Sequence, residues 1–301
     1  SFDAAKDYVR SQKSPIVVKA DGLAAGKGSI VAPSTEEALQ ALSRIMEEHA
    51  FGSAGDRVVI EECLEGWEVS LLAFSDGKTV VPMVPACDYK RVFDGDQGPN
   101  TGGMGSYSPP NLFGEALAER VMNAILQPAV EAMAREGKAY KGVLYAGLMI
   151  TDEGPKVMEF NARFGDPENQ VMIPRLRSDL VDIMLAVIDG TLDRIRVEWS
   201  DEACVGVVMA SGGYPGSYTT GFPIDGLDEV DEDILLFHAG TKAREGRVYT
   251  DGGRVLTVAA LARTMAEARE KVYRNIPRIR FQGCHYRKDI AAREVEDQAC
   301  R

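Results

Sequence analysis

The segment at residues 157–168 constrains the fold and function of the chain more than any other. It reads V-M-E-F-N-A-R-F-G-D-P-E, so its polar side chains Glu159, Asn161 and Arg163 stand two residues apart before a Gly-Asp-Pro turn. Successive side chains of a strand point to opposite faces of a sheet. The spacing therefore predicts a buried strand that presents these three side chains on one face and then runs into a turn.

The polar side chains of this segment suit metal and phosphate binding. A carboxylate and a carboxamide on one face are hard oxygen ligands of the kind that magnesium prefers. An arginine beside them suits a phosphate or a carboxylate, because its planar guanidinium can donate two parallel hydrogen bonds. The residues alone leave a second interpretation open, in which the segment is an edge strand with a solvated polar face.

The size and charge of the chain exclude several classes of protein. With 301 residues, of which 45% are hydrophobic, it can bury a substantial core, and its length suggests about two domains. A formal net charge of -12 argues against nucleic acid as a partner, although a local basic site can still bind a small phosphorylated substrate. The sequence shows no apolar run near the ~20 residues of a membrane span and no signal segment. We therefore expect a cytoplasmic protein without membrane contact.

Cysteine and histidine form no metal or disulfide pattern. The five cysteines are widely spaced and make no C-x-x-C pair, and the three histidines are isolated from one another. We therefore expect reduced thiols, no zinc site and no chemistry based on histidine.

A glycine-rich loop follows a short β-branched segment near the start of the chain. Residues 16–19 read I-V-V-K and predict a strand that ends in Lys19, and residues 20–28 read A-D-G-L-A-A-G-K-G. Glycines let backbone N–H groups approach an anion, which favours a flexible flap over nucleotide phosphates. The spacing does not match the G-x-x-x-x-G-K-[ST] loop. A plain glycine-rich turn with exposed lysines is the alternative.

Residues 57–74 predict two apolar strands joined by an acidic link that contains Gly66. Backbone groups at such a hinge can pair with an adenine, and Glu68, at the start of the second strand, can contact ribose hydroxyls. An acidic hinge that faces water is the alternative.

Residues 82–110 contain five glycines, five prolines and little periodicity, which predicts a long loop. Charged residues gather at Asp88, Lys90 and Arg91, and a second cluster, N-T-G-G-M-G, begins at Asn100. These donors, charges and permissive glycines favour a substrate-binding loop over a linker or a disordered segment.

Helices and strands are predicted for most of the remaining chain, at residues 2–10, 35–46, 113–135, 142–150, 155–160, 166–189, 204–210, 255–262 and 265–276. Pro128 is expected to kink or split one of these helices, and Gly190 is expected to end another. The charged sequence after Asp289 is expected to fray.

Four motifs in one order resemble a known family. They are V-V-K-A-D-G-L-A-A-G-K-G, V-I-E-E-C-L-E-G-W-E-V-S, D-Y-K-R with D-G-D-Q-G-P-N-T-G-G-M-G-S-Y, and M-E-F-N-A-R-F-G-D-P-E. Together they closely resemble phosphoribosylamine–glycine ligase (glycinamide ribonucleotide synthetase) of the ATP-grasp superfamily, up to about Asp289. The resemblance implies an ATP-dependent carbon–nitrogen ligase of purine biosynthesis. Such enzymes join glycine to 5-phosphoribosylamine through glycyl phosphate, giving glycinamide ribonucleotide, ADP and phosphate.

The resemblance also implies a fold of the α+β class, an ATP-grasp. Two α+β subdomains would grip ATP, namely residues 1–65 as the small subdomain or lid and residues 66–195 as the large subdomain with the metal and substrate loop. A small C-terminal α+β domain would follow at residues 196–290, and residues 291–301 would form a tail. Relatives usually carry an N-terminal dinucleotide-fold-like domain of about a hundred residues. Part of the phosphoribosylamine site is then expected on that domain, in the same chain or in another.

The same resemblance assigns residues to ligands. Magnesium, or manganese, would be held by Glu159 and Asn161. ATP would be contacted by Lys19, Gly26, Lys27, Gly28, Glu61, Glu62, Cys63, Leu64 and Glu68. The substrates would be contacted by Asp88, Lys90, Asn100, Thr101, Gly102, Gly103, Met104, Gly105, Arg163 and Asp166. The catalytic residues would be Lys19, Lys27, Arg163, Asp88 and Lys90. Cys87 and Tyr89 stand where many relatives carry glutamine and histidine, which leaves the roles of those two side chains open.

Two alternative functions stay open on the sequence. One is another ATP-grasp carboxylate–amine ligase, which should lack the N-T-G-G-M-G cluster beside D-Y-K-R. The other is a truncated nucleotide-binding module without full activity. A dinucleotide oxidoreductase is disfavoured, because no G-x-G-x-x-G follows a strand and opens a helix.

Overall fold

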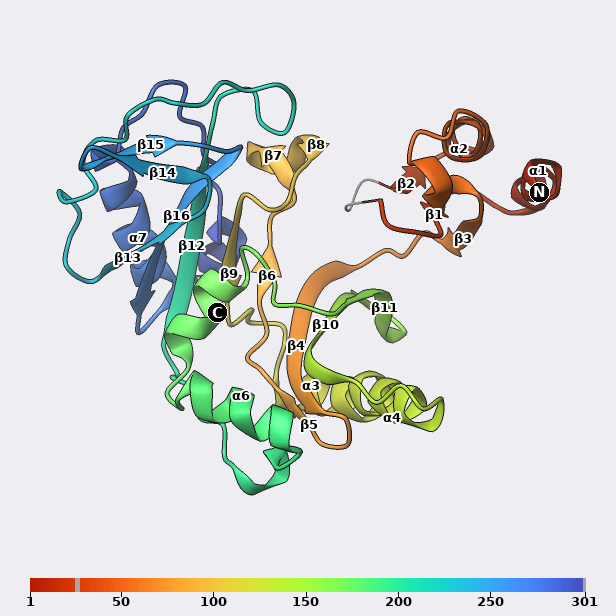
Figure 1. Cartoon of the computed structure of the whole chain (residues 1–301), viewed down its shortest axis with the longest axis horizontal. Coiled ribbons are helices and arrows are strands. Elements are labelled where there is room, and N and C mark those ends of the chain that lie inside the picture. Colours follow the sequence, from red (N-terminus) through yellow and green to blue (C-terminus); the bar gives the residue numbers. More distant parts are fainter. Residues whose placement is uncertain (25–27, 300–301) are drawn as a thin grey trace. The chain divides into compact units, whose positions relative to one another are not determined.

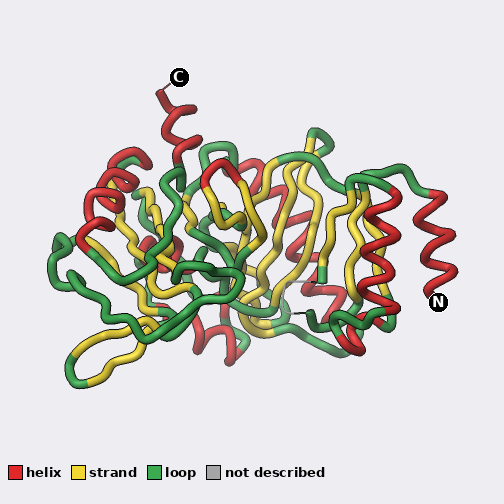
Figure 2. Tube along the Cα trace, turned by 90° about the horizontal axis from the view of Figure 1, so that it is seen from above, coloured by secondary structure: helices red, strands yellow, loops and turns green. Residues whose placement is uncertain are grey.

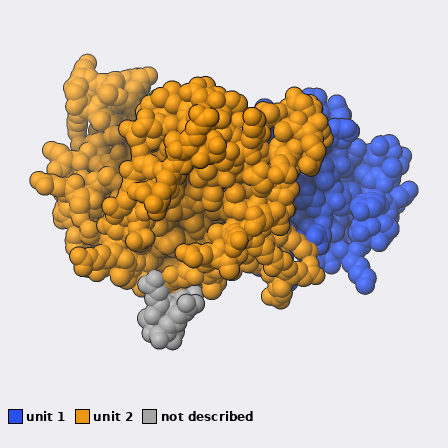
Figure 3. All heavy atoms as spheres, turned by 90° about the horizontal axis from the view of Figure 1, so that it is seen from below, with its two compact units in different colours: residues 1–66 blue, residues 67–301 orange. Residues whose placement is uncertain are grey.

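The computed structural model describes residues 1–24 and 28–299 (Figure 1). The chain forms two compact units, Ser1–Gly66 and Trp67–Arg301 (Figure 3). No helix of the described residues is long and apolar enough to cross a membrane.

The first unit is a three-stranded antiparallel sheet with two helices. Its strand order is β2-β1-β3, with β1 at Ile16–Ala20, β2 at Ser29–Ala32 and β3 at Val58–Glu62. The helices α1 (Phe2–Ser11) and α2 (Thr35–Leu42) pack with the central strand in one apolar cluster. Its buried members are Val9, Ile16, Val18, Ala32, Ala38, Ala41, Leu42 and Ile45. A π-helical turn (Ser43–Glu47) and a 3-10 turn (Gly52–Gly55) lead from α2 to β3.

The second unit begins with a four-stranded antiparallel sheet in the order β11-β10-β4-β5. Its strands are β4 (Trp67–Asp76), β5 (Val80–Pro82), β10 (Lys141–Thr151) and β11 (Gly154–Asn161). Side chains of β4 alternate between two cores, because Leu71 packs in the cluster that includes Val121, whereas Phe74 packs in the cluster that includes Ile183. Helices therefore cover both faces of this sheet.

A second sheet joins short strands of residues 82–110 to the C-terminal part of the chain. Its order is β13-β16-β12-β9-β6. The members are β6 (Cys87–Asp88), β9 (Gly105–Ser108), β12 (Ala203–Ala210), β13 (Ile234–His238) and β16 (Arg254–Ala262). The helix α7 (Met265–Asn275) packs on this sheet. Two hairpins complete the unit, β7 (Arg91–Phe93) with β8 (Gln97–Asn100), and β14 (Thr241–Arg244) with β15 (Arg247–Thr250).

The prediction of one long loop at residues 82–110 was therefore wrong. Two of its short strands pair in a sheet whose central strand, β12, comes about a hundred residues later. Val205 of β12 lies opposite Tyr107, and Tyr107 in turn lies opposite Cys87. Composition could not reveal these strands, because the pairing that stabilises them is distant in sequence.

Two helix predictions need correction in the middle of the chain. Residues 113–135 form α3 (Glu115–Val121), a π-helical turn (Met122–Leu126) and α4 (Gln127–Arg135), so the break comes in the turn before Pro128. Residues 166–189 form not one helix but α5 (Asn169–Met172), a 3-10 turn (Ile173–Arg175) and α6 (Leu180–Asp189). Pro174 interrupts the first, and the Asp179 side chain caps the second by accepting from Val181 N. Gly190 ends α6 with a φ of 72°, as predicted.

Residues 292–299 form a helix that is anchored near its start, whereas the sequence after Asp289 was expected to fray. The helix α8 spans Ala292–Ala299 and is the last helix of the trace (Figure 2). Its Glu294 is buried and accepts hydrogen bonds from Tyr107 Oη and Asn111 N, each at 3.0 Å. A buried carboxylate with two donors is well satisfied, so this turn stays attached to the sheet.

Candidate active site

The candidate metal ligands lie at the end of the β10–β11 hairpin. Glu159 lies opposite Gly147 and Asn161 lies opposite Tyr145. Asn161 Nδ2 donates to Glu159 Oε1 at 2.9 Å, so the two side chains share one face, as predicted. A Cβ at position 147 would lie 3.3 Å from Glu159 Cγ, so the glycine there leaves room for the carboxylate side chain. The strand is at the edge of its sheet, and its residues are half-buried or exposed with none fully buried, so the prediction of a buried strand was wrong.

The donor set of this pair fits magnesium. Among the described residues, no group of three or more His, Cys, Asp or Glu side chains is placed to hold a metal ion by itself. Magnesium, however, is commonly bound by one or two protein carboxylates together with substrate phosphates and water. Glu159 and Asn161 supply two adjacent oxygen donors at an exposed strand end, where a phosphate can approach.

The segment after β11 does not continue the strand. Arg163 lies beyond the last paired residue, and its Nη1 donates to the carbonyl of Phe164 at 2.8 Å. The prediction that Arg163 shares the strand face with Glu159 was therefore wrong, since the strand ends at Asn161. Asp166 forms a bidentate ion pair with Arg254 of β16, with both N–O distances at 3.1 Å.

The N-T-G-G-M-G cluster packs on the end of this segment. Gly103 has a φ of 112°, and a Cβ built on it would lie 2.3 Å from Cδ of Pro167. Its N–H donates to Thr101 Oγ1 at 2.9 Å, and the same hydroxyl donates to the carbonyl of Lys90 at 2.8 Å. The loop is thereby connected to the strand exit on one side and to Lys90 on the other. Asn100 ends β8, Met104 is fully buried, and Gly105 begins β9 opposite Val207.

Two residues that the motif analysis did not predict hold this loop in place. Arg254 Nη1 donates to the carbonyls of Gly102 and Asp166, each at 2.9 Å. Tyr214 Oη accepts from Gly102 N at 3.0 Å. Both come from the C-terminal part of the chain, more than a hundred residues after the loop, and no local spacing could have revealed them.

The charged residues of the substrate segment form a half-buried network. Lys90 Nζ pairs with the Glu68 carboxylate and lies 3.7 Å from Asp88 Oδ1, whose side chain is 9% exposed. Burial lowers the pKa of Lys90, but Asp88 and Glu68 more than offset it, so its pKa lies above the usual value. Glu68, assigned to the ribose by the resemblance, is thus a partner of Lys90.

A buried carboxylate that the motif analysis missed lies near this network. Glu168 Oε1 accepts from Tyr145 Oη at 2.6 Å and from Ser70 Oγ at 3.1 Å. The pKa of Asp88 is raised to about 7: burial raises it most, the charge of Lys90 lowers it, and the charges of Glu168 and Glu68 raise it. The sequence signal for Glu168 was its place after Asp-Pro, which was interpreted only as the start of a helix.

The raised pKa of Asp88 predicts stability that falls as the pH rises from about 4 to about 7. In this range the folded protein keeps a proton that the unfolded chain, with an ordinary pKa of 3.8, releases. The shift corresponds to at most about 4 kcal/mol. Asp88→Asn should remove this slope, as measured by denaturant unfolding across the pH range. Asp152→Asn, at an exposed turn, is the control, and equal slopes in both variants would contradict the shift.

The residues assigned to ATP occupy the first unit, apart from Glu68. Lys19 of β1 pairs with Glu61 of β3, with Nζ 2.6 Å from Oε2. Ala20 N donates to the carbonyl of Gly28 at 2.9 Å and closes the base of the glycine-rich loop. Gly26 and Lys27 lie outside the described residues. Glu62 ends β3, and the half-buried Cys63 and Leu64 follow it.

The fold and the strand-end site define an ATP-grasp protein. The ATP-grasp (A) domain model of phosphoribosylglycinamide synthetase matches residues 1–169, and the C domain model of the same enzyme matches residues 204–293. The biotin carboxylase domain of 2-oxoglutarate carboxylase from Hydrogenobacter thermophilus, solved with MgADP, ADP and bicarbonate, shares the fold. The TM-score is 0.71 at 15% sequence identity, over 95% of this chain and 61% of that one.

Relatives with more similar sequences identify the family. The phosphoribosylamine–glycine ligase of Halalkalibacterium halodurans is 53% identical over 299 residues, which are 99% of this chain and 69% of that protein. The solved structure of the Thermotoga maritima ligase has a TM-score of 0.86 at 35% identity, over 97% of this chain and 72% of that one. The trifunctional purine biosynthetic protein adenosine-3 of Bos taurus is 52% identical over 292 residues, 96% of this chain and 29% of that protein. The chain belongs to the phosphoribosylglycinamide synthetase family. The predictions of an α+β ATP-grasp fold and of an ATP-dependent ligase are confirmed.

Proposed function

We propose that this chain joins glycine to 5-phosphoribosylamine with the splitting of ATP, and that its second unit carries the transfer site. The observation that carries the proposal is the packing of Gly103 on Pro167, because it brings the N-T-G-G-M-G loop to the exit of the strand that presents Glu159 and Asn161. The proposed metal donors and the proposed substrate loop therefore belong to one compact unit.

The chain's own residues have electrostatic and positioning tasks in this reaction. The glycine carboxylate attacks the γ-phosphate of ATP, and the amine of 5-phosphoribosylamine then displaces phosphate from glycyl phosphate, so no side-chain nucleophile is needed. Magnesium or manganese on Glu159 and Asn161 would neutralise part of the phosphate charge. Lys19 and Lys27 are proposed to neutralise more of it.

The substrate residues are proposed to orient the two small molecules. Asp88 and Lys90, with the loop from Asn100 to Gly105, would supply polar side chains and backbone groups at the edge of a sheet. Arg163 and Asp166 follow the strand that carries Glu159 and Asn161, and Asp166 is linked to Gly102 of the loop through Arg254. Holding two reactants in a fixed orientation speeds a bimolecular reaction strongly, because their translational and rotational entropy is lost on binding and not in the reaction step.

Several finer assignments remain proposals. The domain boundaries at residues 65, 195 and 290 are proposed as functional divisions, although the second sheet draws strands from both sides of residue 195. A cytoplasmic location is proposed from the nature of the reaction. An N-terminal domain is a proposed partner for the phosphoribosylamine site, since the relatives compared above are longer than this chain.

A coupled assay of ADP release tests the proposed function. We expect a rate that needs ATP, a divalent cation, glycine and 5-phosphoribosylamine together, and no rate when either small substrate is omitted. A rate with a different carboxylate and no response to glycine would support another ATP-grasp ligase. ATP binding in calorimetry without any turnover would support a nucleotide-binding module without full activity. Either of these two results would contradict the proposal.

A further inference from the structure

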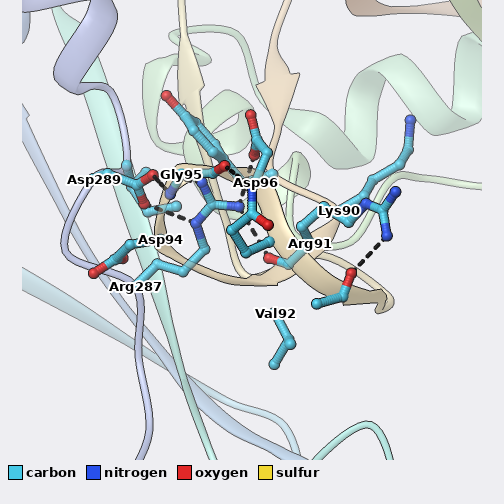
Figure 4. Close-up of polar contacts among 12 residues, drawn as sticks. Lys90, Arg91, Val92, Asp94, Gly95, Asp96, Arg287 and Asp289 are labelled. Carbon is cyan, nitrogen blue, oxygen red and sulfur yellow. Dashed lines mark hydrogen bonds and ion pairs between the residues drawn. The ribbon is translucent and has the colours of Figure 1, made fainter.

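The second unit contains a fully buried arginine that the proposed reaction does not use. The side chain of Arg287 is 0% exposed. Figure 4 shows it among its carboxylate and carbonyl partners. Its Nε and Nη2 donate to the two carboxylate oxygens of Asp289 at 2.7 and 2.6 Å. Its Nη1 donates to Asp96 Oδ1 at 2.9 Å and to the carbonyl of Arg91 at 3.0 Å. The guanidinium also lies over the ring of Tyr89, 4.7 Å from its centroid.

Neighbouring bonds fasten the same two segments to each other. Gly95 N donates to Asp289 Oδ2 at 2.9 Å, and Lys288 N donates to Asp94 Oδ1 at 2.7 Å. Ala291 N donates to Tyr89 Oη at 3.0 Å. The tip of the β7–β8 hairpin is therefore bound on several sides by residues 287–291, which we call the C-terminal clasp.

The charge balance of the clasp indicates specific positioning. A buried guanidinium is costly unless carboxylates and carbonyls satisfy it, and here all three nitrogens have partners. Apolar side chains of the same volume often stabilise a fold as well as a buried ion pair does. The planar, forked guanidinium of an arginine, however, restrains the position of each hydrogen-bond partner more closely than apolar contacts do.

The clasp contacts residues that adjoin the substrate segment. Tyr89 lies between Asp88 and Lys90 in the chain. Arg91, whose carbonyl Arg287 binds, directly follows Lys90, and the carbonyl of Lys90 accepts a hydrogen bond from Thr101. We propose that Arg287, with Asp289, is a positioning residue that holds the β7–β8 hairpin so that Asp88, Lys90 and the N-T-G-G-M-G loop keep the geometry needed for the amine substrate. The catalytic part of this inference rests on the proposed function.

Hydrogen–deuterium exchange of the full chain tests the clasp without any need for turnover. In Arg287→Met, peptides that cover residues 89–101 should exchange about 10-fold faster or more, while peptides that cover β4 keep their protection. Arg287→Lys keeps the charge but loses the fork, and should give a smaller increase. Arg278→Met is the matched control, because Arg278 also donates to a carboxylate and a carbonyl, those of Asp231 and Glu229, away from the hairpin.

Steady-state kinetics separate positioning from general stability. In Arg287→Met, kcat/KM for 5-phosphoribosylamine should fall about 10- to 100-fold, whereas KM for ATP stays within about 2-fold. If Arg287→Met fails to fold, the milder Asp289→Asn should produce the same selective exchange and the same kinetic split. Unchanged exchange at residues 89–101 in the folded variants, or an equal loss for all substrates, would overturn the inference. Absent turnover in the wild-type chain would contradict the proposed function, and the exchange result would still decide the role of the clasp.

Discussion

Glu159→Gln is expected to lower kcat by at least about 100-fold while the protein stays folded. The substitution keeps the size of the side chain and one oxygen, but removes the formal negative charge with which the proposed site would attract a divalent cation. Glu159 is exposed and, among the described residues, accepts a side-chain hydrogen bond from Asn161, so its loss should change the melting temperature little. The measurement is ADP release at saturating substrates over a range of magnesium concentrations.

A matched carboxylate on the same hairpin provides the control for this prediction. Glu153 lies in the turn between β10 and β11 and pairs with Lys156 at 2.9 Å. Glu153→Gln should leave kcat unchanged. A second measurement, the binding of Mn²⁺ in the presence of ATP by electron paramagnetic resonance, should weaken in Glu159→Gln alone. If the Glu159→Gln variant turned over at the wild-type rate at saturating magnesium, Glu159 would hold no essential metal.

Gly103→Ala is expected to have the second large effect, on both stability and activity. The φ of 112° disfavours any side chain, and the new Cβ would lie 2.3 Å from Cδ of Pro167, in a backbone-anchored ring that cannot turn away. Together the strain and the overlap should reduce the free energy of unfolding by about 2–4 kcal/mol. Displacement of the loop from the strand exit should lower kcat/KM for the small substrates by about 100-fold.

Gly137→Ala separates backbone strain from the close contact. Gly137 follows α4 and has a φ of 72°, but a Cβ there would meet nothing within 4 Å. We expect this variant to lose about 1 kcal/mol of stability and no activity. Denaturant unfolding and ADP release should be measured for both variants. If they behave alike in both assays, the contact between Gly103 and Pro167 does not position the site.

The C-terminal part of the chain has a direct share in the candidate site. Arg254 and Tyr214 bind the N-T-G-G-M-G loop, and Arg287 binds the hairpin that precedes it. The strands β12 and β16 belong to the same sheet as β6 and β9 of the substrate segment. The motif analysis assigned no site residue to the predicted C-terminal domain at residues 196–290, yet contacts from this part of the chain hold the substrate loop in place.

Local spacing was sufficient for features that depend on neighbours along the chain. Glu159 and Asn161 share a face because side chains two residues apart in a strand must do so. Gly190 ends α6 because glycine accepts a left-handed conformation at little cost. The order of four motifs was also enough to indicate the family, because each motif is contiguous in the sequence.

Tertiary structure alone decided the features that depend on distant partners. The strands β6 and β9 form because a later strand, β12, pairs with β9, and β11 is an edge strand because no other strand of the described residues pairs with its outer side. Arg254, Glu168 and Arg287 became recognisable only through contacts with residues far away in the chain. The sequence by itself determined which oxygen donors the proposed metal strand carries, and that they share one face. The fold decided which distant charges surround the site, because long-range pairing leaves no periodic signal in either of the segments that it joins.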